Sequence, residues 1–341
     1  MEISVVIPVF NEAKQIEVTL LELEAYMKGL LASNDWEIIV VNDGSSDETL
    51  EVLNRLSQKK NWLRVVDLKA RFGRGRALRA GFEESRGRLI VSLDADLSYA
   101  PNHIERMVDK MEKENADIVL ASAYRKGGRV KNVPWPRLWV SRLGNKILAY
   151  MFSGQVTVLT CMVRAYRSEF IKRLDLNCND KDIHLEILYK ARLLGGKIVE
   201  VPADLCWRKE RFFKGRSLNN IKRRSTASFK KTSSSHLFFA LLNKPGLIFW
   251  VPGYFLLLVS ISIFIVTAKI IFSDMAGGTS LYFALRNSMI QATPSWITMV
   301  ISFILGIQFF TLGFLTNQNK SNYEEIYKTL HSIFAEVKKQ G

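Results

Sequence analysis

The sequence predicts an α/β domain with a mostly parallel sheet, followed by two membrane-spanning helices. Three observations predict this fold class. Short β-rich runs alternate with amphipathic stretches over the first 120 residues, which is typical of a sheet with helices on both faces. The runs lack a regular alternation of apolar and polar residues, as strands covered on both faces do. Two long apolar segments then occupy the C-terminal part of the chain.

The strands and helices of the α/β part follow one another in a simple order. Five strands are expected over Ser4–Val9, Trp36–Val41, Arg64–Leu68, Arg88–Leu93 and Asp117–Ala121. Ser122–Pro136 contains glycines and prolines and no apolar period, so we expect a mobile loop there. The next expected elements are a helix over Arg137–Phe152, a strand near Val156–Val163, a helix over Asp182–Leu194 and a strand over Lys197–Val201.

Two apolar segments predict a membrane hairpin. Gly246–Phe272 is almost wholly apolar and reaches roughly 40 Å at about 1.5 Å per residue, enough to cross the hydrocarbon core with tilt. Pro294–Thr316 is the second segment, with Gln308 as its most polar side chain, and Ser273–Thr293 joins the two. The alternative is a buried core helix for each, and their length favours spans.

The distribution of Lys and Arg predicts the orientation of this hairpin. The connecting loop has only Arg286. The other flanks hold Lys222, Arg223, Arg224, Lys230, Lys231, Lys244, Lys320, Lys328, Lys338 and Lys339. We therefore expect both termini and the α/β domain to be cytoplasmic. Met1 leads straight into a strand, so no signal peptide is expected.

The formal net charge of +15 is concentrated near the membrane. Residues 1–206 have 31 basic and 28 acidic side chains (+3), and residues 207–341 have 17 and 5 (+12). Ser217–Leu242, basic and then apolar, is expected to form an interfacial helix. Such cations attract anionic headgroups or a phosphorylated lipid, and their location argues against nucleic acid as the partner. Cys161, Cys178 and Cys206 lack metal-ligand spacing, and their odd number suits a reducing compartment.

Four parts are thus expected along the chain. They are an α/β domain over residues 1–208, basic juxtamembrane helices over 209–243, a transmembrane hairpin over 244–318 and an amphipathic tail helix over 319–341. Ser321 and Glu324 form a capping box at the start of the tail helix. The tail could lie on the membrane, dock on the α/β domain or pair with another copy, which would make the protein a homo-oligomer.

Polar clusters follow three of the expected strands. These clusters are Asn11-Glu12, Asn42–Asp47 and Asp94-Ala95-Asp96. Because ligands of such sheets bind at the carboxyl ends of the strands, one crevice could contain all three. Asp94 and Asp96 offer hard oxygen ligands to Mg²⁺ or Mn²⁺, with water and a ligand diphosphate in the other positions. The alternative is a strand end that is simply rich in aspartate.

The three motifs VVIPVFNE (residues 5–12), VVNDGS (40–45) and LDADL (93–97) together resemble family 2 glycosyltransferases of the GT-A fold, a Rossmann-like catalytic domain. The resemblance is strongest to the dolichol-phosphate mannose synthase and polyprenyl-phosphate glycosyltransferase group. It spans roughly residues 3–208, and the membrane hairpin fits it too.

The resemblance implies a binding site for a nucleotide-sugar, UDP- or GDP-linked. Its implied residues are Pro8, Phe10, Glu12, Asp43, Gly73, Gly75 and Asp94. The glycine turn would let the backbone approach the donor, whereas for Asp43 the alternative is a turn that caps the helix near Asp47. Asp94 and Asp96, with Ser98 as a poorer third ligand, would hold Mg²⁺ or Mn²⁺ at the donor diphosphate.

The resemblance also implies a polyprenyl phosphate acceptor, dolichyl or undecaprenyl, and a lipid-linked monosaccharide as product. Arg137 and Ser141, four residues apart on one helical face, match the family's acceptor-phosphate pair and, with Asp94 and Asp96, are the implied catalytic residues. A solvated arginine that caps a helix is the alternative for Arg137. Arg208 and Arg211 lie where the family has further basic contacts.

The chemistry expected from this acceptor needs no strong base. A phosphate monoester is largely dianionic at pH 7, so it is already a nucleophile, and in-line attack would invert the donor's anomeric configuration. His184 and Glu186 are candidates for a supporting role, and a surface or structural role is preferred for both.

Four departures from the family concern the sugar and acceptor pocket. Ala123 replaces an arginine, with Arg125 two residues later, Val158 replaces an acid, Cys161-Met162 replaces a Ser-Gly pair and Leu218 replaces a lysine. Two other interpretations therefore stay open: transfer to another lipid, such as a glycerolipid or ceramide, and a non-catalytic lipid-binding scaffold.

Overall fold

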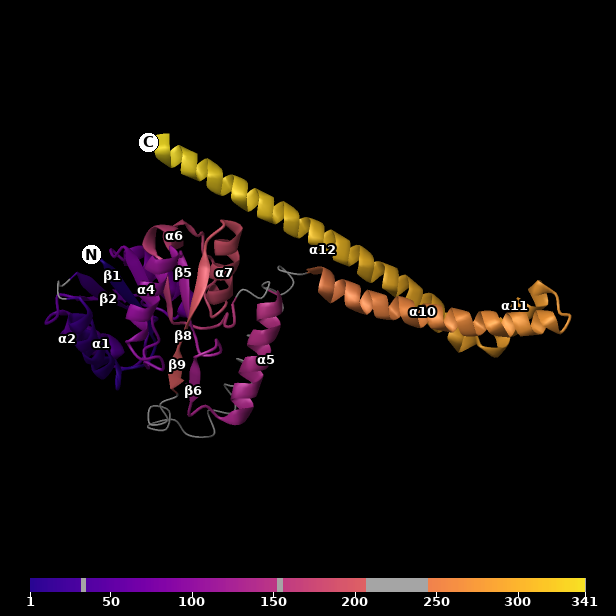
Figure 1. Cartoon of the computed structure of the whole chain (residues 1–341), viewed down its shortest axis with the longest axis horizontal. Coiled ribbons are helices and arrows are strands. Elements are labelled where there is room, and N and C mark those ends of the chain that lie inside the picture. Colours follow the sequence, from indigo (N-terminus) through magenta and orange to yellow (C-terminus); the bar gives the residue numbers. More distant parts are fainter. Residues whose placement is uncertain (32–34, 152–155, 207–244, 341) are drawn as a thin grey trace. The chain divides into compact units, whose positions relative to one another are not determined.

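The computed structural model describes residues 1–31, 35–151, 156–206 and 245–340 (Figure 1). The chain divides into two compact units, Met1–Phe239 and Ala240–Gly341, and each is described by itself.

The first unit is built on a seven-stranded sheet. Its strands are β1 (Ile3–Val9), β2 (Trp36–Asn42), β3 (Leu63–Asp67), β4 (Leu89–Ser92), β5 (Ile118–Ser122), β7 (Arg164–Arg167) and β8 (Ile198–Pro202), in the spatial order β3-β2-β1-β4-β7-β5-β8. Only β7 is antiparallel to its neighbours. The mostly parallel α/β sheet predicted from the sequence is therefore confirmed.

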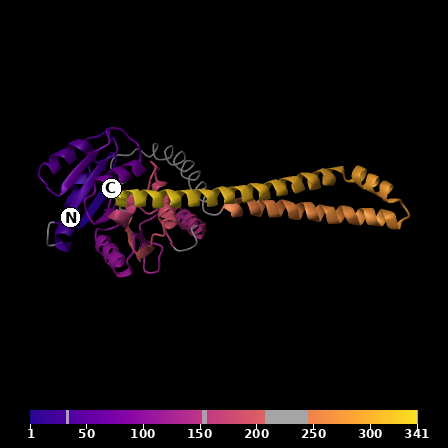
Figure 2. The ribbon, with the colours of Figure 1, turned by 90° about the horizontal axis from the view of Figure 1, so that it is seen from above.

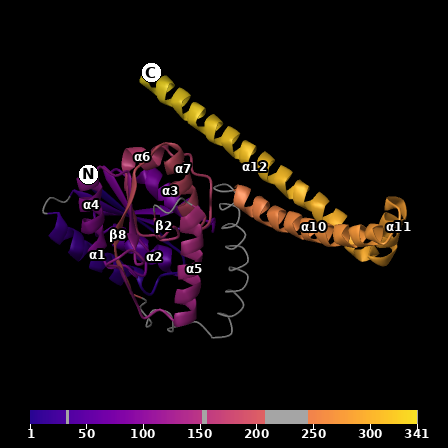
Figure 3. The ribbon, with the colours of Figure 1, turned by 45° about the vertical axis from the view of Figure 1, so that its right-hand side comes forward.

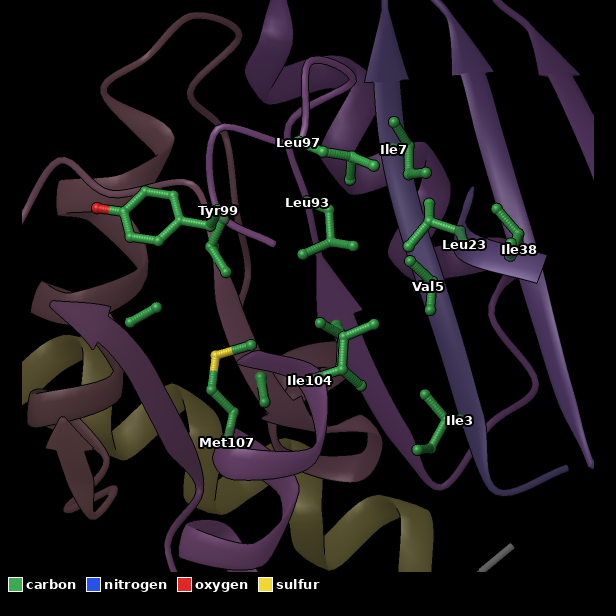
Figure 4. Close-up of a cluster of buried hydrophobic side chains, with 14 of the residues drawn as sticks. Ile3, Val5, Ile7, Leu23, Ile38, Leu93, Leu97, Tyr99, Ile104 and Met107 are labelled. Carbon is green, nitrogen blue, oxygen red and sulfur yellow. The ribbon is translucent and has the colours of Figure 1, made fainter. Parts of the chain in front are cut away.

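Helices cover both faces of this sheet. The described helices of this unit are α1 (Ile16–Leu30), α2 (Thr49–Ser57), α3 (Arg74–Glu84), α4 (His103–Glu114), α5 (Trp135–Met151), α6 (Ser168–Arg173) and α7 (Ile183–Leu193), and α5 lies beside the sheet rather than on one of its faces (Figure 1). Alternate residues of a strand point to opposite faces. Figure 4 shows Ile3, Val5 and Ile7 of β1 beside Leu23 of α1 and Ile104 of α4 in one buried cluster.

The other face of β1 receives helix α3. Gly81 of α3 lies so close to Val6 that an added Cβ would meet the valine Cγ1 at 2.3 Å. The glycine therefore allows α3 to approach the sheet closely, which brings the start of this helix to the carboxyl end of β1 and β2.

The chain order reverses beside β1. From β1 the chain builds β2 and β3 on one side, and then β4 on the other side. Such a switch point leaves a crevice outside the carboxyl ends of the flanking strands, where doubly wound sheets bind ligands.

The expected strand near Val156–Val163 is wrong. The strand is β7, Arg164–Arg167, and the preceding described segment 156–163 is held by side chains instead of a ladder. The Glu200 carboxylate accepts the backbone N–H groups of Thr157 and Val158, and the Asn145 side-chain oxygen accepts that of Leu159. These bonds satisfy the backbone that a strand would otherwise pair.

The expected loop over residues 122–136 contains one short strand. This is β6 (Arg129–Lys131), which pairs in parallel with β9 (Asp204–Cys206) in a separate two-stranded sheet. The loop is thus tied at its middle to the chain that follows β8.

The second unit is a helical hairpin. It consists of α10 (Pro245–Ala276), the short α11 (Leu281–Gln291) and α12 (Thr293–Gln340), and α10 and α12 lie side by side in Figures 2 and 3. Two segments, Ile248–Ala276 and Thr293–Ile333, are long and apolar enough to cross a membrane. Gly253 and Gly306 allow a close approach, since an added Cβ on either glycine would lie 3.3 Å from the other's carbonyl oxygen.

The tail expected to be helical from residue 319 is helical to Gln340, but it is not a separate element. Helix α12 runs unbroken from the second span to Gln340, because no glycine or proline interrupts residues 314–340 and Lys320 pairs with Glu324 one turn later at 3.7 Å. Ser321 lies inside this helix rather than at its start. The interfacial helix expected over Ser217–Leu242 lies outside the described residues.

Candidate functional site

A cavity of about 630 Å³ opens at the carboxyl ends of β1, β2 and β4. Its lining residues are Pro8, Val9, Phe10, Glu12, Asp43, Arg71, Phe72, Gly73, Arg74, Asp94, Ala95, Asp96, Asp180 and Lys181. All three predicted polar clusters contribute to it, so the prediction of one shared crevice is confirmed. Gly75 and Ser98 are not among the lining residues.

The first two clusters are hydrogen-bonded to each other. Asn11 adopts a left-handed conformation (φ +57°), which asparagine tolerates better than most residues. Its backbone N–H donates to Ser45 Oγ at 3.0 Å, and the Ser46 N–H donates to Asn11 Oδ1 at 2.8 Å. The strand ends of β1 and β2 are therefore fixed relative to each other, which positions Phe10 and Glu12 on the crevice wall.

Asp43 holds the turn that precedes α3. Its Oδ1 accepts the backbone N–H groups of Phe72 at 2.8 Å and Gly73 at 3.0 Å. The helix-capping role that was the alternative for Asp43 is filled by Asp47, whose Oδ1 accepts the Thr49 N–H at 3.1 Å. Asp43 thus lines the crevice and also fixes its opposite rim.

The pKa of Asp94 is shifted by burial and by neighbouring charged side chains. Burial raises its pKa, Asp96 adds to the rise, and Arg74 and Lys181 act against it. Its ion pair is with Arg74, whose Nη1 lies 3.6 Å from Asp94 Oδ1. Asp96 Oδ1 accepts the backbone N–H of Ser98 at 2.9 Å, which orients the second carboxylate.

These two carboxylates fit a hard divalent ion that keeps open coordination positions. Within the described part of the chain, no group of three or more His, Cys, Asp and Glu side chains could hold a metal. The remaining ligands would therefore be water and the oxygens of a bound anion, as Mg²⁺ commonly has. Ser98 contributes its backbone N–H to Asp96, and its side chain does not line the crevice.

The glycine turn also admits another segment of the chain to the crevice. An added Cβ on Gly75 would lie 2.4 Å from the carbonyl oxygen of Cys178, and one on Gly73 would lie 2.6 Å from that of Asn179. Gly75 N–H also donates to the Asn179 carbonyl at 2.6 Å. The missing side chains thus admit the 178–180 loop, which brings Asp180 and Lys181 to the crevice.

Several lining residues were not predicted. The Arg71 guanidinium lies over the Phe10 ring, 4.0 Å from its centroid, and closes one side of the crevice. Arg74, Asp180 and Lys181 line it as well. The alternating Arg-Gly pattern of residues 71–76 and the charged run before α7 were the available signals, but only the contact between these segments shows that they share one site.

His184 and Glu186 have structural roles. Glu186 accepts the backbone N–H groups of Asn177 and Cys178 at 2.9 and 2.8 Å and pairs with buried Lys190 at 2.8 Å. The His184 ring is buried, neither ring nitrogen has a hydrogen-bond partner among the described residues, and burial lowers its pKa well below the usual value. Both residues are buried, and neither lines the crevice.

The predicted acceptor residues are only partly described. Ser141 lies on α5 with its Oγ 2.7 Å from the Tyr124 hydroxyl. Arg137 belongs to the first turn of α5, and its side chain lies outside the described part of the structure. Arg208, Arg211 and Leu218 also lie outside the described residues. Ala123 and Val158 are both buried.

Comparison with known proteins decides the family. Residues 4–175, half of the chain, match the family Glycosyl transferase family 2. The chain belongs to this family. Among curated glycosyltransferase relatives, the dolichol-phosphate mannosyltransferase of Pyrococcus furiosus is 32% identical over 205 residues, which cover 59% of this chain and 56% of that protein. The undecaprenyl-phosphate 4-deoxy-4-formamido-L-arabinose transferase of an Enterobacter species is 33% identical, over 59% of this chain and 58% of that protein.

A third relative matches over more of its own length. The polyprenol monophosphomannose synthase of Mycolicibacterium smegmatis is 30% identical, over 58% of this chain and 75% of that protein. The chain spans between a third and about three fifths of the other relatives' length.

Solved structures confirm the GT-A fold. The glucosyl-3-phosphoglycerate synthase of Mycobacterium tuberculosis, in complex with Mn²⁺, UDP-glucose and phosphoglyceric acid, superposes with a TM-score of 0.51 at 20% identity, over 70% of this chain and 79% of that one.

Proposed function

We propose that this glycosyltransferase transfers one sugar from a UDP- or GDP-linked donor to a polyprenyl phosphate and so makes a lipid-linked monosaccharide. The observation that carries the proposal is the convergence of Glu12, Asp43, Asp94 and Asp96 in one crevice at the switch point of the sheet. Three relatives are named for transfer to polyprenyl or dolichyl phosphates, and two helices are apolar and long enough to cross a membrane.

The donor would lie along the crevice. Phe10 and Arg71 offer a stacked pair of flat groups for the base, and Pro8, Glu12 and Asp43 surround it. Arg74 and Lys181 are the cations nearest to Asp94, so they are suited to the charge of the donor diphosphate. The backbone of Gly73 lines the crevice, and a side chain at this position would collide with residues 179–180.

Asp94 and Asp96 would hold a divalent ion, Mg²⁺ or Mn²⁺, with Ser98 behind them. When bound, such an ion neutralises charge that builds on the departing nucleoside diphosphate. Asp96 is already oriented for this by the Ser98 N–H, and Asp94 pairs with Arg74 at 3.6 Å.

The acceptor phosphate would approach from α5, where Arg137 and Ser141 lie, with Arg208 and Arg211 as further basic contacts. Because a phosphate monoester is largely dianionic at pH 7, it can attack the anomeric carbon without a base. His184 is buried away from such a role, which suits a phosphate nucleophile better than a hydroxyl. Attack opposite the diphosphate would invert the configuration.

The membrane arrangement belongs to the same proposal. Helices α10 and α12 would cross the membrane, with both termini and the catalytic domain on the cytoplasmic side, because the loop between the spans has only Arg286 and the other flanks are rich in Lys and Arg.

The experiment is a transfer assay with purified full-length protein. Undecaprenyl or dolichyl phosphate, Mg²⁺ or Mn²⁺ and a mixture of UDP- and GDP-sugars are incubated together, and new lipids are identified by mass spectrometry. One new lipid-linked sugar that is absent with Asp96→Asn and present with Asp109→Asn, a change on the exposed face of α4, supports the proposal. Product only with ceramide or diacylglycerol would assign another lipid acceptor, and nucleotide binding without product would favour a scaffold.

A further inference from the structure

One face of α12 carries a line of exposed side chains over most of the helix. Eleven residues follow one another at steps of three or four, and the ten steps together cover 36 residues, which is the period of a straight α-helix. Nine of the eleven are apolar and between 39% and 61% exposed. We call this face the α12 stripe, and its residues are Ile301, Leu305, Gln308, Leu312, Leu315, Asn319, Tyr323, Ile326, Leu330, Ile333 and Val337.

The stripe is not the face of α12 that packs against α10. That face contains Gly306, which approaches Gly253 of α10, and Phe309, whose ring centroid lies 6.4 Å from that of Phe249. At about 100° per residue, the stripe is centred about 110° around the helix from these two contacts. Figure 1 shows α12 continuing beyond the start of α10, so α10 leaves the stripe uncovered.

Gln308 lies on the stripe inside the second apolar segment. It is eight residues before Thr316, about 12 Å from the expected end of the span, and its side chain is exposed. An amide that faces hydrocarbon is unfavourable unless a neighbouring helix supplies hydrogen bonds. A lipid-facing surface is the simpler interpretation for the apolar residues of a span, but it does not account for Gln308.

The stripe continues past Thr316, beyond the expected end of the span. The exposed large apolar side chains described in this part of α12 all belong to the stripe. Residues 319–340 hold four lysines and three glutamates, so they lack the strongly basic face with which interfacial helices bind anionic membranes. Helix α12 is also unbroken to Gln340, so it leaves the membrane along its own axis instead of lying on the surface. Protein, rather than lipid, is therefore the partner that suits this part of the stripe.

We propose that the α12 stripe binds the stripe of a second copy of this chain. The partner must cross the membrane and continue beyond it as a helix, which α12 of another copy does. Two copies inserted in the same direction have parallel α12 helices, and a twofold axis between them places each residue opposite its own counterpart. Gln308 then faces Gln308, Asn319 faces Asn319, and apolar side chains face apolar side chains.

The composition of the stripe suits this symmetric pairing. The eleven residues include no Asp, Glu, Lys or Arg, so two copies bring no like charges face to face. A shift of one helix along the other would place the amides of Gln308 and Asn319 against apolar side chains, so the two amides fix the register. The proposal concerns assembly and does not depend on the identity of the donor or the acceptor.

The first test is cysteine cross-linking of the full-length protein in membranes. The protein is oxidised with copper phenanthroline, and covalent dimers are measured on non-reducing gels. Ile326→Cys and Leu330→Cys on the stripe should form dimers, because equivalent side chains lie close together across a parallel pair. Lys328→Cys and Ser332→Cys, which lie on other faces of the same turns, should form dimers no faster than the wild-type chain, which gives the background from the native cysteines.

The second test measures the strength of the pairing. The equilibrium between monomer and dimer is followed by analytical ultracentrifugation of the purified full-length protein in detergent. Leu330→Glu places two carboxylates opposite each other and should weaken dimerisation by about tenfold or more. Gln308→Leu should weaken it by about threefold, and Phe303→Leu, at an exposed position on another face of the span, is the control. Binding of UDP or GDP with Mn²⁺ should be unchanged in all three variants, which shows that they are folded.

Cross-linking confined to the stripe, together with weaker dimers of Leu330→Glu, supports the proposal. A wild-type monomer at all protein concentrations would overturn it, and so would dimers that Leu330→Glu leaves unchanged, because these would use another surface. Equally fast cross-linking of Lys328→Cys would also overturn it, since random collisions would then explain the dimers. A monomeric wild type whose thermal stability falls in Leu330→Glu would instead assign the stripe to a contact within one chain.

Discussion

The Arg74 guanidinium lies 3.6 Å from the Asp94 carboxylate, with 40% and 26% of the two side chains exposed. A divalent ion on Asp94 would have to share or displace this contact. We expect Arg74→Gln to raise the affinity for Mn²⁺, measured by calorimetry without nucleotide, by up to about fivefold, because exposed pairs are worth about 0.2–1 kcal/mol. Arg55→Gln, which breaks the exposed pair between Arg55 of α2 and Glu17 of α1, is the control.

The same variant should weaken binding of UDP or GDP in the presence of Mn²⁺, since Arg74 would then be a lost partner of the diphosphate. Opposite signs for the ion and the nucleotide are the expected signature. Weaker Mn²⁺ binding without nucleotide would show that Arg74 does not compete for Asp94.

Gly75→Ala should weaken nucleotide binding, because it displaces a loop that contributes to the crevice. The new Cβ would lie 2.4 Å from the Cys178 carbonyl oxygen, so the 178–180 loop must shift at a cost of about 1–3 kcal/mol. Asp180 and Lys181 would move with it, and nucleotide affinity should fall. The control is Gly29→Ala in α1, which meets nothing within 4 Å and should be neutral or stabilising in thermal unfolding. Equal behaviour of the two variants would contradict this account.

The parallel strands of the sheet were predictable because they are mostly continuous apolar runs, and their boundaries were found within about two residues, whereas the antiparallel strand β7 was misplaced. The polar strand ends were predictable for a related reason, since parallel strands bring their carboxyl ends to one edge. This rule alone was enough to predict that Glu12, Asp43 and Asp94 share one site.

The 178–181 loop was not predictable in this way. Its position depends on the absence of two Cβ atoms at Gly73 and Gly75, which lie about a hundred residues earlier in the chain. It also depends on a hydrogen bond from the Cys178 backbone N–H to the buried Glu186 carboxylate. The segment before β7 was missed for the same kind of reason: it has the apolar residues of a strand, but the buried side chains of Glu200 and Asn145 satisfy its backbone.

Glu186→Ala should be strongly destabilising. Glu186 and Lys190 are both buried, so loss of the carboxylate removes the ion pair with the Lys190 ammonium and the acceptor of two backbone N–H groups, a change that costs about 3–5 kcal/mol. Urea unfolding of the solubilised protein measures the loss. Glu169→Ala, at an exposed position of α6, should change the free energy of unfolding by less than about 0.5 kcal/mol. A small effect of Glu186→Ala would mean that the pair is solvated.

The proposed orientation predicts which side of the membrane each end of the hairpin faces. Ser280→Cys, between α10 and α11, should react with a membrane-impermeant maleimide on intact cells, and Ser332→Cys near the end of α12 should react only after permeabilisation. The wild-type chain gives the background, because Cys161 is buried and Cys178 and Cys206 are half-buried. Labelling of Ser332→Cys on intact cells would reverse the orientation.

His184 should make the protein sensitive to acid. Burial first, and then the cations Arg164, Arg74 and Lys181, lower its pKa in the folded state well below 6.5. Below about pH 6.5, His184 therefore binds a proton in the unfolded chain but not in the folded chain. The free energy of unfolding then falls by up to about 1.4 kcal/mol per pH unit until the pH reaches the folded-state pKa of His184. Thermal unfolding of wild type and His184→Gln at pH 7.5 and pH 5 separates this effect from packing, which acts at both values. The wild type should lose more stability on acidification than the variant does, and equal losses would place the acid-sensitive group elsewhere.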